Sequence, residues 1–173
     1  MKLITMVLML SITFAASAQT RRDKKIIKDA VEAKKELVKA DNAISTFFEN
    51  SAGYVIFPNV GEGGFVVGAA SGNGVLYEKG LEKGMVNLKK IDVGFQAGGQ
   101  AVIEVIFFEN ENDVAEFKED NFEFSAQISA VALKSGVAAN AKYKNGVAVF
   151  TLPKSGLMAK VSVGGQKFKY HSF

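Results

Sequence analysis

Residues 101–108 have the sequence AVIEVIFF, which is apolar on both faces of a strand except at Glu104. Such a run is typical of a central strand, because a strand that is covered on both faces has little contact with water. We therefore expect a β-sheet built around this stretch. A lone acid in such a run rarely makes a site, so we expect Glu104 to be partly buried in an ion pair with Lys160 or Lys167.

Alternation with a period of two continues on both sides of this stretch. It predicts further strands at 54–57, 63–70, 74–79, 84–90, 93–98, 122–130, 146–152 and 157–163. A turn is expected at 71–73, and Asp113 with Glu116 is expected to cap a short helix near 113–119. Many strand positions are glycine, which marks bends, bulges or close backbone approach. The prediction is therefore a strongly curved, Gly-rich antiparallel sheet with a barrel-like shape.

The segment before the sheet has a helical period. Its apolar residues are spaced alternately by four and three positions, at Ile26, Ala30, Ala33, Leu37, Ala40, Ile44 and Phe47. This predicts one amphipathic helix, or a helix pair if Asp41 and Asn42 cap a second helix that ends near Glu49. Packed on the sheet, it makes the fold class α+β. The same stripe fits two arrangements: its whole length packs on the core, or its first turns lie on a membrane.

The first eighteen residues have the pattern of a secretory signal peptide: Lys2 precedes an apolar run at 3–15 and the small residues at 16–18. We expect cleavage after Ala18 and an exported protein, periplasmic or secreted. The expected organisation is a signal peptide at 1–18, a basic N-terminal arm at 19–28 and one domain at 29–173.

The amino-acid composition limits the kinds of catalytic and metal-binding site that the protein can have. The 173 residues include no Cys and a single histidine, His171, which we expect to lie in a frayed C-terminus. Disulfides, zinc–thiolate sites, iron–sulfur clusters and thiol nucleophiles are thereby excluded, and histidine-based triads are poorly supported. We therefore expect a protein that is not an enzyme and has no cofactor and no metal.

Positive charge is concentrated near the N-terminus. Residues 21–40 hold eight basic and four acidic side chains. A basic segment on a near-neutral body fits an anionic surface better than duplex nucleic acid, so nucleic acid is not an expected partner. In this hypothesis Ile26 and Ile27 insert shallowly into a membrane after electrostatic capture. The capturing cations would be Arg21, Arg22, Lys24, Lys25 and Lys28.

Several segments together resemble the SYLF domain family, also called the Ysc84 type. They are AGYVIFP (52–58), GGFVVG (63–68), GVL (74–76), VGFQAGGQ (93–100) and KSGLMAKVSVGG (154–165). The resemblance implies binding of anionic lipid through an amphipathic N-terminal segment, and binding of actin by fungal members. Residues 84–90 lack the aromatic, proline-bearing stretch of the eukaryotic members, and an exported protein would not meet actin. The expected partner is therefore an anionic phospholipid or another amphiphile, in peripheral contact with a membrane.

Two further hypotheses concern binding. Gly94 and Gly98 share one face of a predicted strand, where missing side chains would leave a shallow groove for an amphiphile beside Gln96 and Gln100. The alternative function is an exported structural or protein-interaction module with no lipid ligand. In that case exposed aromatic side chains such as Phe47, Phe48 or Phe173 would dock a protein partner.

Overall fold

A computed structural model gives the fold of most of the chain. It describes residues 20–62, 69–91, 101–119, 122–125, 127–154 and 163–173. The expected signal peptide at 1–18 and the expected strand at 93–98 lie outside these residues, as does nearly all of 157–163.

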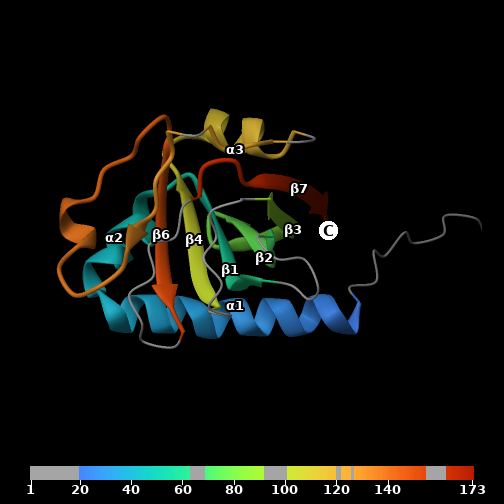
Figure 1. Cartoon of the computed structure of the whole chain (residues 1–173), viewed down its shortest axis with the longest axis horizontal. Helices are drawn as coiled ribbons and strands as arrows, with labels where there is room; N and C mark the ends of the chain where they lie inside the picture. Colours follow the sequence, from blue (N-terminus) through green and yellow to red (C-terminus); the bar gives the residue numbers. More distant parts are fainter. Residues whose placement is uncertain (1–19, 63–68, 92–100, 120–121, 126, 155–162) are drawn as a thin grey trace, which may run out of the picture.

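The described residues form an α+β fold, as the sequence predicts. The helices are α1 (Arg21–Ala40), α2 (Ser45–Asn50) and α3 (Glu111–Phe117), with the 3₁₀ helices η1 (Asn42–Ile44) and η2 (Ala138–Asn140). The strands are β1 (Gly53–Glu62), β2 (Ala69–Glu78), β3 (Leu81–Ile91), β4 (Val102–Phe108), β5 (Val131–Ala132), β6 (Val147–Pro153) and β7 (Lys167–Ser172). Together they make one sheet in the order β5-β6-β4-β1-β2-β3-β7 (Figure 1).

Two features of this sheet differ from the expectation. Strands β5 and β6 run parallel, so the sheet is mixed, although every other neighbouring pair is antiparallel. The sheet is also open, because no hydrogen-bonded ladder between the described parts of β5 and β7 closes a barrel.

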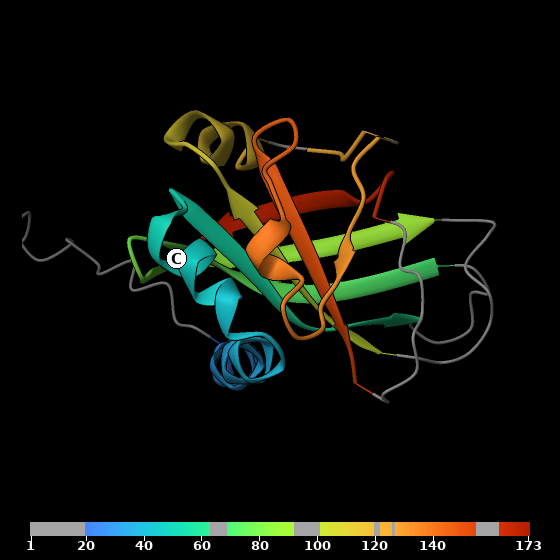
Figure 2. The ribbon, with the colours of Figure 1, turned by 90° about the vertical axis from the view of Figure 1, so that its left-hand side faces the viewer.

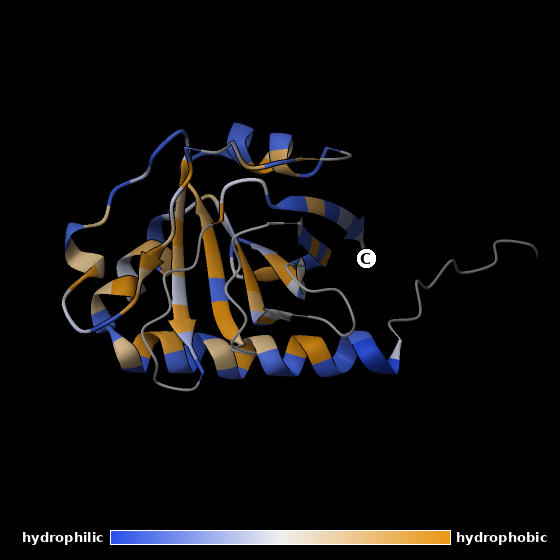
Figure 3. Ribbon diagram, viewed as in Figure 1, coloured by the Kyte–Doolittle hydropathy of each residue, from blue (hydrophilic) through white to orange (hydrophobic). Residues whose placement is uncertain are grey.

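Helix α1 begins at a capping box and packs on the sheet through its small residues. The Thr20 hydroxyl accepts a hydrogen bond from the Asp23 N–H at 3.1 Å, and the Asp23 carboxylate accepts one from the Thr20 N–H at 2.9 Å. Ala30, Ala33 and Leu37 are buried where α1 contacts β1 and β2. Figure 3 shows the result: α1 is apolar toward the sheet and polar on its other side.

The two faces of the sheet bury separate cores. On the outer face, α1, α2 and residues 131–143 cover side chains such as Phe107 and Phe150. On the inner face, α3 and residues 122–130 cover side chains that include Phe57 and Phe108. Figure 2, which looks along α1, shows the helix on one side of the curved sheet and α3 on the other. β4 is buried at every position, as predicted for a central strand.

Curvature brings distant strands together across the inner face. The rings of Phe57 in β1 and Phe168 in β7 lie 6.0 Å apart between centroids, although β2 and β3 separate these strands in the sheet. Glycine permits part of this approach: a Cβ atom on Gly74 would lie 2.6 Å from Cδ1 of Phe57. The prediction that strand glycines mark close approach is confirmed at this position.

Residues 122–132 span the opening between the two edges of the sheet. The Phe124 N–H donates to the Gln166 carbonyl at 2.9 Å, and the Phe168 N–H donates to the Phe122 carbonyl at 2.8 Å. The same segment then reaches β6 through β5. The prediction of a long strand at 122–130 is therefore wrong. Phe124 and Ile128 are nevertheless both buried in the inner core, on the side that the alternation predicts.

Three other local predictions are wrong. Residues 71–73 lie within the continuous strand β2 and form no turn. The residue that caps α3 is Asn110, whose side-chain oxygen accepts a hydrogen bond from the Asp113 N–H at 3.2 Å. The helix therefore begins earlier than expected. His171 is not frayed: it lies in β7, opposite Met85 of β3.

Candidate functional site

The first two turns of α1 carry the predicted basic segment. Ile26 and Ile27 are half-buried and pack against the outer core, and Lys25 forms an exposed ion pair with Asp29 at 2.6 Å. The helix continues without a break past residue 28, where the sequence placed a boundary. Five cations of this segment are exposed: Arg21, Arg22, Lys24, Lys25 and Lys28.

A groove lies between the start of α1 and the polar side of three strands, with a volume of about 790 Å³. Four cationic side chains and one carboxylate line it, so positive charges exceed negative ones by three. They are Arg22 of α1, Lys89 of β3, Lys167 and Lys169 of β7, and Glu123. We call this the basic groove.

Strand register explains why these side chains meet. Lys89 lies directly opposite Lys167, and Asn87 lies opposite Lys169, in the antiparallel pair of β3 and β7. Each of these positions alternates with an inner-core residue, so their side chains leave the sheet on its outer face. Asn87 also donates a hydrogen bond from Nδ2 to the side-chain oxygen of Asn73 at 2.7 Å.

The charges of the basic groove are only partly compensated. Lys167 forms an ion pair with Glu123 at 3.3 Å. Over the described part of the chain, neither Lys89 nor Lys169 has an ion-pair partner. Like charges directly opposite each other across two strands destabilise a sheet, so the Lys89–Lys167 arrangement costs folding free energy.

A second polar cluster lies buried in the inner core. Glu104 is fully buried, and one of its carboxylate oxygens, Oε2, accepts a hydrogen bond from Nε2 of Gln166 at 3.0 Å. Burial raises the pKa of Glu104 to about 7, although the bond from Gln166 and the charge of Lys90 both lower it. The expected ion pair with Lys167 is wrong, because Lys167 pairs with Glu123, and Lys160 lies outside the described residues.

Asp41 joins the end of α1 to a distant loop. Its carboxylate accepts hydrogen bonds from the N–H groups of Ala138 at 2.7 Å and Ala43 at 3.1 Å. The bond from Ala138 is the main cause that lowers the pKa of Asp41 below its ordinary value. The predicted capping role of Asp41 is therefore confirmed, and its long-range bond is an additional finding.

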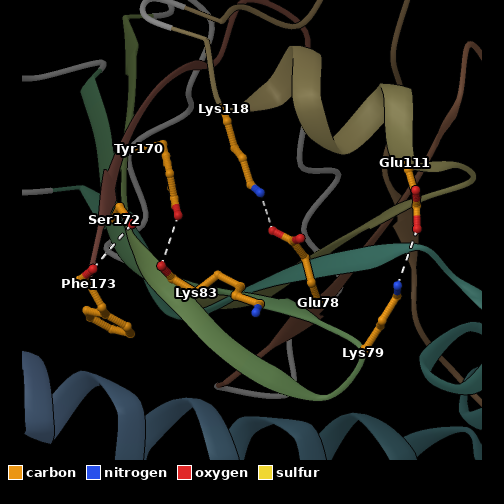
Figure 4. Close-up of polar contacts among 8 residues, drawn as sticks. All are labelled: Glu78, Lys79, Lys83, Glu111, Lys118, Tyr170, Ser172 and Phe173. Atoms are coloured by element: carbon orange, nitrogen blue, oxygen red, sulfur yellow. Dashed lines mark hydrogen bonds and ion pairs between the residues drawn. The ribbon is translucent and has the colours of Figure 1, made fainter.

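A third polar cluster connects the β2–β3 hairpin with α3 (Figure 4). Glu78 pairs with Lys118, and Lys79 pairs with Glu111 at 3.5 Å. The hydroxyl of Tyr170 donates to the Lys83 carbonyl at 2.9 Å. A pocket of about 450 Å³ lies here, and its acids and cations nearly balance, unlike those of the basic groove.

The residues of the predicted amphiphile groove are not among those that the structure describes. Gly94, Gln96, Gly98 and Gln100 all lie outside the described residues. The groove lysines of β7 were not predicted, although the alternation in KFKYHS (167–172) is the signal of a strand with its lysines on one face.

Among the described residues there is neither a metal-binding cluster nor a membrane-spanning helix. No group of three or more His, Asp or Glu side chains in this part of the chain is arranged to hold a metal ion. None of the described helices is long and apolar enough to cross a membrane.

Part of the chain matches the model of a known protein family. The model of the family Ysc84, described as Las17-binding protein actin regulator, matches residues 89–172. Residues 89–172, a little under half of this chain, are therefore similar to the Ysc84 family. This confirms the resemblance to the SYLF family, whose members are binding modules. The matched segment begins at Lys89 and includes β7, and therefore three of the four groove cations, but it does not include α1.

A curated protein to which this chain is similar is Beta cell expansion factor A from Aeromonas veronii. The two are 25% identical over 123 residues, which is 70% of this chain and 46% of the relative. The chain thus spans about half the length of the relative it matches.

Proposed function

We propose that the protein binds anionic phospholipid at a membrane surface, without catalysis, through the exposed cations of the first two turns of α1. The observation that carries this proposal is that Arg21, Arg22, Lys24, Lys25 and Lys28 are exposed on a helix whose other side is packed on the sheet. Each lysine or arginine near an anionic surface contributes about 1 kcal/mol at most, so several must act together.

The packing of Ile26 and Ile27 bears on how such binding works. Both side chains are half-buried against the outer core, so insertion into a bilayer would require them to give up that contact. We therefore expect the electrostatic step to dominate and binding to fall steeply as salt screens the surface charge. We further propose export, which the pattern of residues 1–18 supports and which would keep this surface away from cytoplasmic actin.

The test is flotation of the protein with phosphatidylcholine vesicles that contain or lack phosphatidylserine. The variant combines Arg21→Gln, Lys24→Gln and Lys28→Gln, which leaves the groove residue Arg22 in place. We expect at least about tenfold weaker binding to the anionic vesicles, because up to about 1 kcal/mol is lost per cation.

The matched control neutralises three exposed lysines elsewhere, Lys134, Lys142 and Lys154. It removes the same net charge, so it separates a local surface from a general charge effect. Equal losses in both variants, or equal binding of the wild type to neutral and anionic vesicles, would contradict the proposal.

The alternative of a protein-interaction module is less well supported. Phe47 and Phe48 were expected to be exposed, but both are half-buried and pack on Phe107, at centroid distances of 5.4 and 4.8 Å. Phe173 is also half-buried. Phe47 and Phe48 thus contribute to the outer core instead of forming an exposed apolar patch.

A further inference from the structure

We propose that the basic groove binds a phosphate monoester, whose phosphate group carries nearly two negative charges at neutral pH. This inference deepens the proposed function. Two kinds of molecule could supply the phosphate group, and for the first of them, a phospholipid headgroup, the inference rests on the proposed function. The other source is a soluble phosphate monoester, and the two share the chemistry that the groove recognises.

Positively charged side chains from distant parts of the chain meet in the basic groove. The cations of the groove come from segments that are far apart in sequence: Arg22 lies in the first turn of α1, Lys89 near the end of β3, and Lys167 and Lys169 in the first half of β7. Glu123 compensates one of them through its ion pair with Lys167. The remaining excess of three positive charges favours an anion that carries more than one negative charge.

Without a ligand, the opposed lysines of β3 and β7 destabilise the sheet. Lys89 and Lys167 face each other across β3 and β7, and Lys169 follows two residues later on the same face. Within the described ranges no carboxylate pairs with Lys89 or Lys169. An anion between these ammonium groups would replace repulsion with attraction, which makes the groove a site that binding stabilises.

The hydrogen-bond donors and the volume of the basic groove also fit a phosphate monoester. A phosphate monoester offers three acceptor oxygens and nearly two negative charges at neutral pH, which matches several ammonium groups and one guanidinium fork. Asn73 accepts the bond from Asn87 with its side-chain oxygen, so its own amide N–H groups are left to donate. The volume of about 790 Å³ lies within the range of small-molecule sites.

A neighbouring pocket provides the contrast. The pocket beside α3 contains Lys79, Lys83 and Lys118, but Glu78 and Glu111 pair with two of these lysines (Figure 4). Lysines alone are therefore not what distinguishes the basic groove. Its distinguishing feature is that the described side chains that line it include four cations and a single acid, Glu123.

The experiment titrates the full chain with two monomeric probes, glycerol 3-phosphate and short-chain phosphatidic acid, and follows backbone amide shifts by NMR. We expect saturable shifts at residues 87–89 and 167–169 with at least one probe. The variant Lys89→Gln/Lys169→Gln should bind that probe at least about tenfold more weakly, since it removes two of the uncompensated charges. The control Lys79→Gln/Lys83→Gln should bind as the wild type does.

The two probes identify the source. Equal affinity for both indicates a soluble phosphate ester, whereas binding of phosphatidic acid alone indicates a lipid headgroup, and either result supports the site. Shifts that do not saturate with either probe, or an equal loss in the control variant, would overturn it. Because the flotation test uses variants that keep Lys89 and Lys169, the groove and the surface of α1 can fail separately.

Discussion

At the scale of single residues, Glu104 and Gln166 each leave one buried oxygen without a partner. These are Oε1 of Glu104 and Oε1 of Gln166, and no hydrogen-bond donor reaches either within the described residues. A protonated Glu104 carries the missing donor, since a carboxylic acid and an amide can exchange two hydrogen bonds. Protonation of Glu104 would supply such a donor, in agreement with a pKa raised to about 7.

This pair predicts a pH-dependent stability. The native pKa of Glu104 lies above its ordinary value of 4.5, so the folded state holds the proton more tightly than the unfolded state. The free energy of unfolding should therefore fall as pH rises from about 4.5 to 7, by about 3 kcal/mol from this group. Glu104→Gln keeps an oxygen to accept the bond from Gln166 without the charge, and should flatten this dependence.

The measurement is urea unfolding at about pH 5 and about pH 8 for the wild type, Glu104→Gln and the exposed control Glu116→Gln. Glu116→Gln should follow the wild type. A wild type that is equally stable at both pH values would contradict the prediction.

Asp41 should act in the opposite direction. Its pKa is lowered, mainly by the bond from Ala138, so its contribution to stability is present above its ordinary pKa of 3.8 and is lost as pH falls through the native value. Asp41→Asn weakens two charge-assisted bonds and should cost about 2 kcal/mol at neutral pH. Thermal or urea unfolding at neutral and acidic pH checks this, because the cost should shrink in acid. A cost that is the same in acid would show that the charge has no role.

At the scale of elements, β2 depends on a missing side chain. A Cβ atom at Gly74 would lie 2.6 Å from the Phe57 ring and 2.7 Å from the Ile56 carbonyl oxygen. We expect Gly74→Ala to destabilise the fold by about 1 to 3 kcal/mol through overpacking. Gly61→Ala is the matched control, because its Cβ atom would make only ordinary contacts, at 3.6 Å or more from Ala101. Urea unfolding of both variants tests the difference, and equal costs would contradict this explanation.

The sequence predicted the elements with local signals and missed those that depend on distant partners. AVIEVIFF is buried at every position of β4, and the period of α1 correctly placed Ala30 and Leu37 on the sheet. The segment KFKYHS is short, and the described strand with which it forms a ladder is β3, about 80 residues earlier. Single-sequence periodicity does not contain this pairing.

The candidate site shows the same division. The cations of α1 are visible as a cluster in the sequence, whereas the opposition of Lys89 and Lys167 follows from the register of β3 with β7. Likewise, the partner of Glu104 lies 62 residues away, at Gln166. Register between strands that no tight turn joins depends on contacts between segments far apart in the chain, which local patterns do not specify.

At the scale of the whole molecule, Phe168 joins parts that the sheet alone would leave apart. Its ring lies 5.2 Å from that of Phe117 in α3, 4.9 Å from that of Phe124 and 6.0 Å from that of Phe57, between centroids. The inner core is thus closed by side chains where the backbone ladder stays open.

Phe168→Ala should therefore affect the whole fold. Removing a buried phenylalanine costs about 3 to 5 kcal/mol, a large part of the 5 to 15 kcal/mol typical of a domain. Phe173→Ala is the control, because Phe173 is half-buried at the chain end. Denaturant midpoints measure both, and a similar small shift for each variant would show that the inner core does not depend on Phe168.

The capping box of α1 has a consequence for the energetics of adsorption. A disordered basic tail would have to fold on the membrane, and the lost conformational entropy would weaken its binding. With Thr20 and Asp23 fixing its first turn, α1 is already a rigid rod that carries its charges in fixed positions. Circular dichroism should accordingly detect no gain of helix on addition of anionic vesicles, and calorimetry should find a heat-capacity change close to zero.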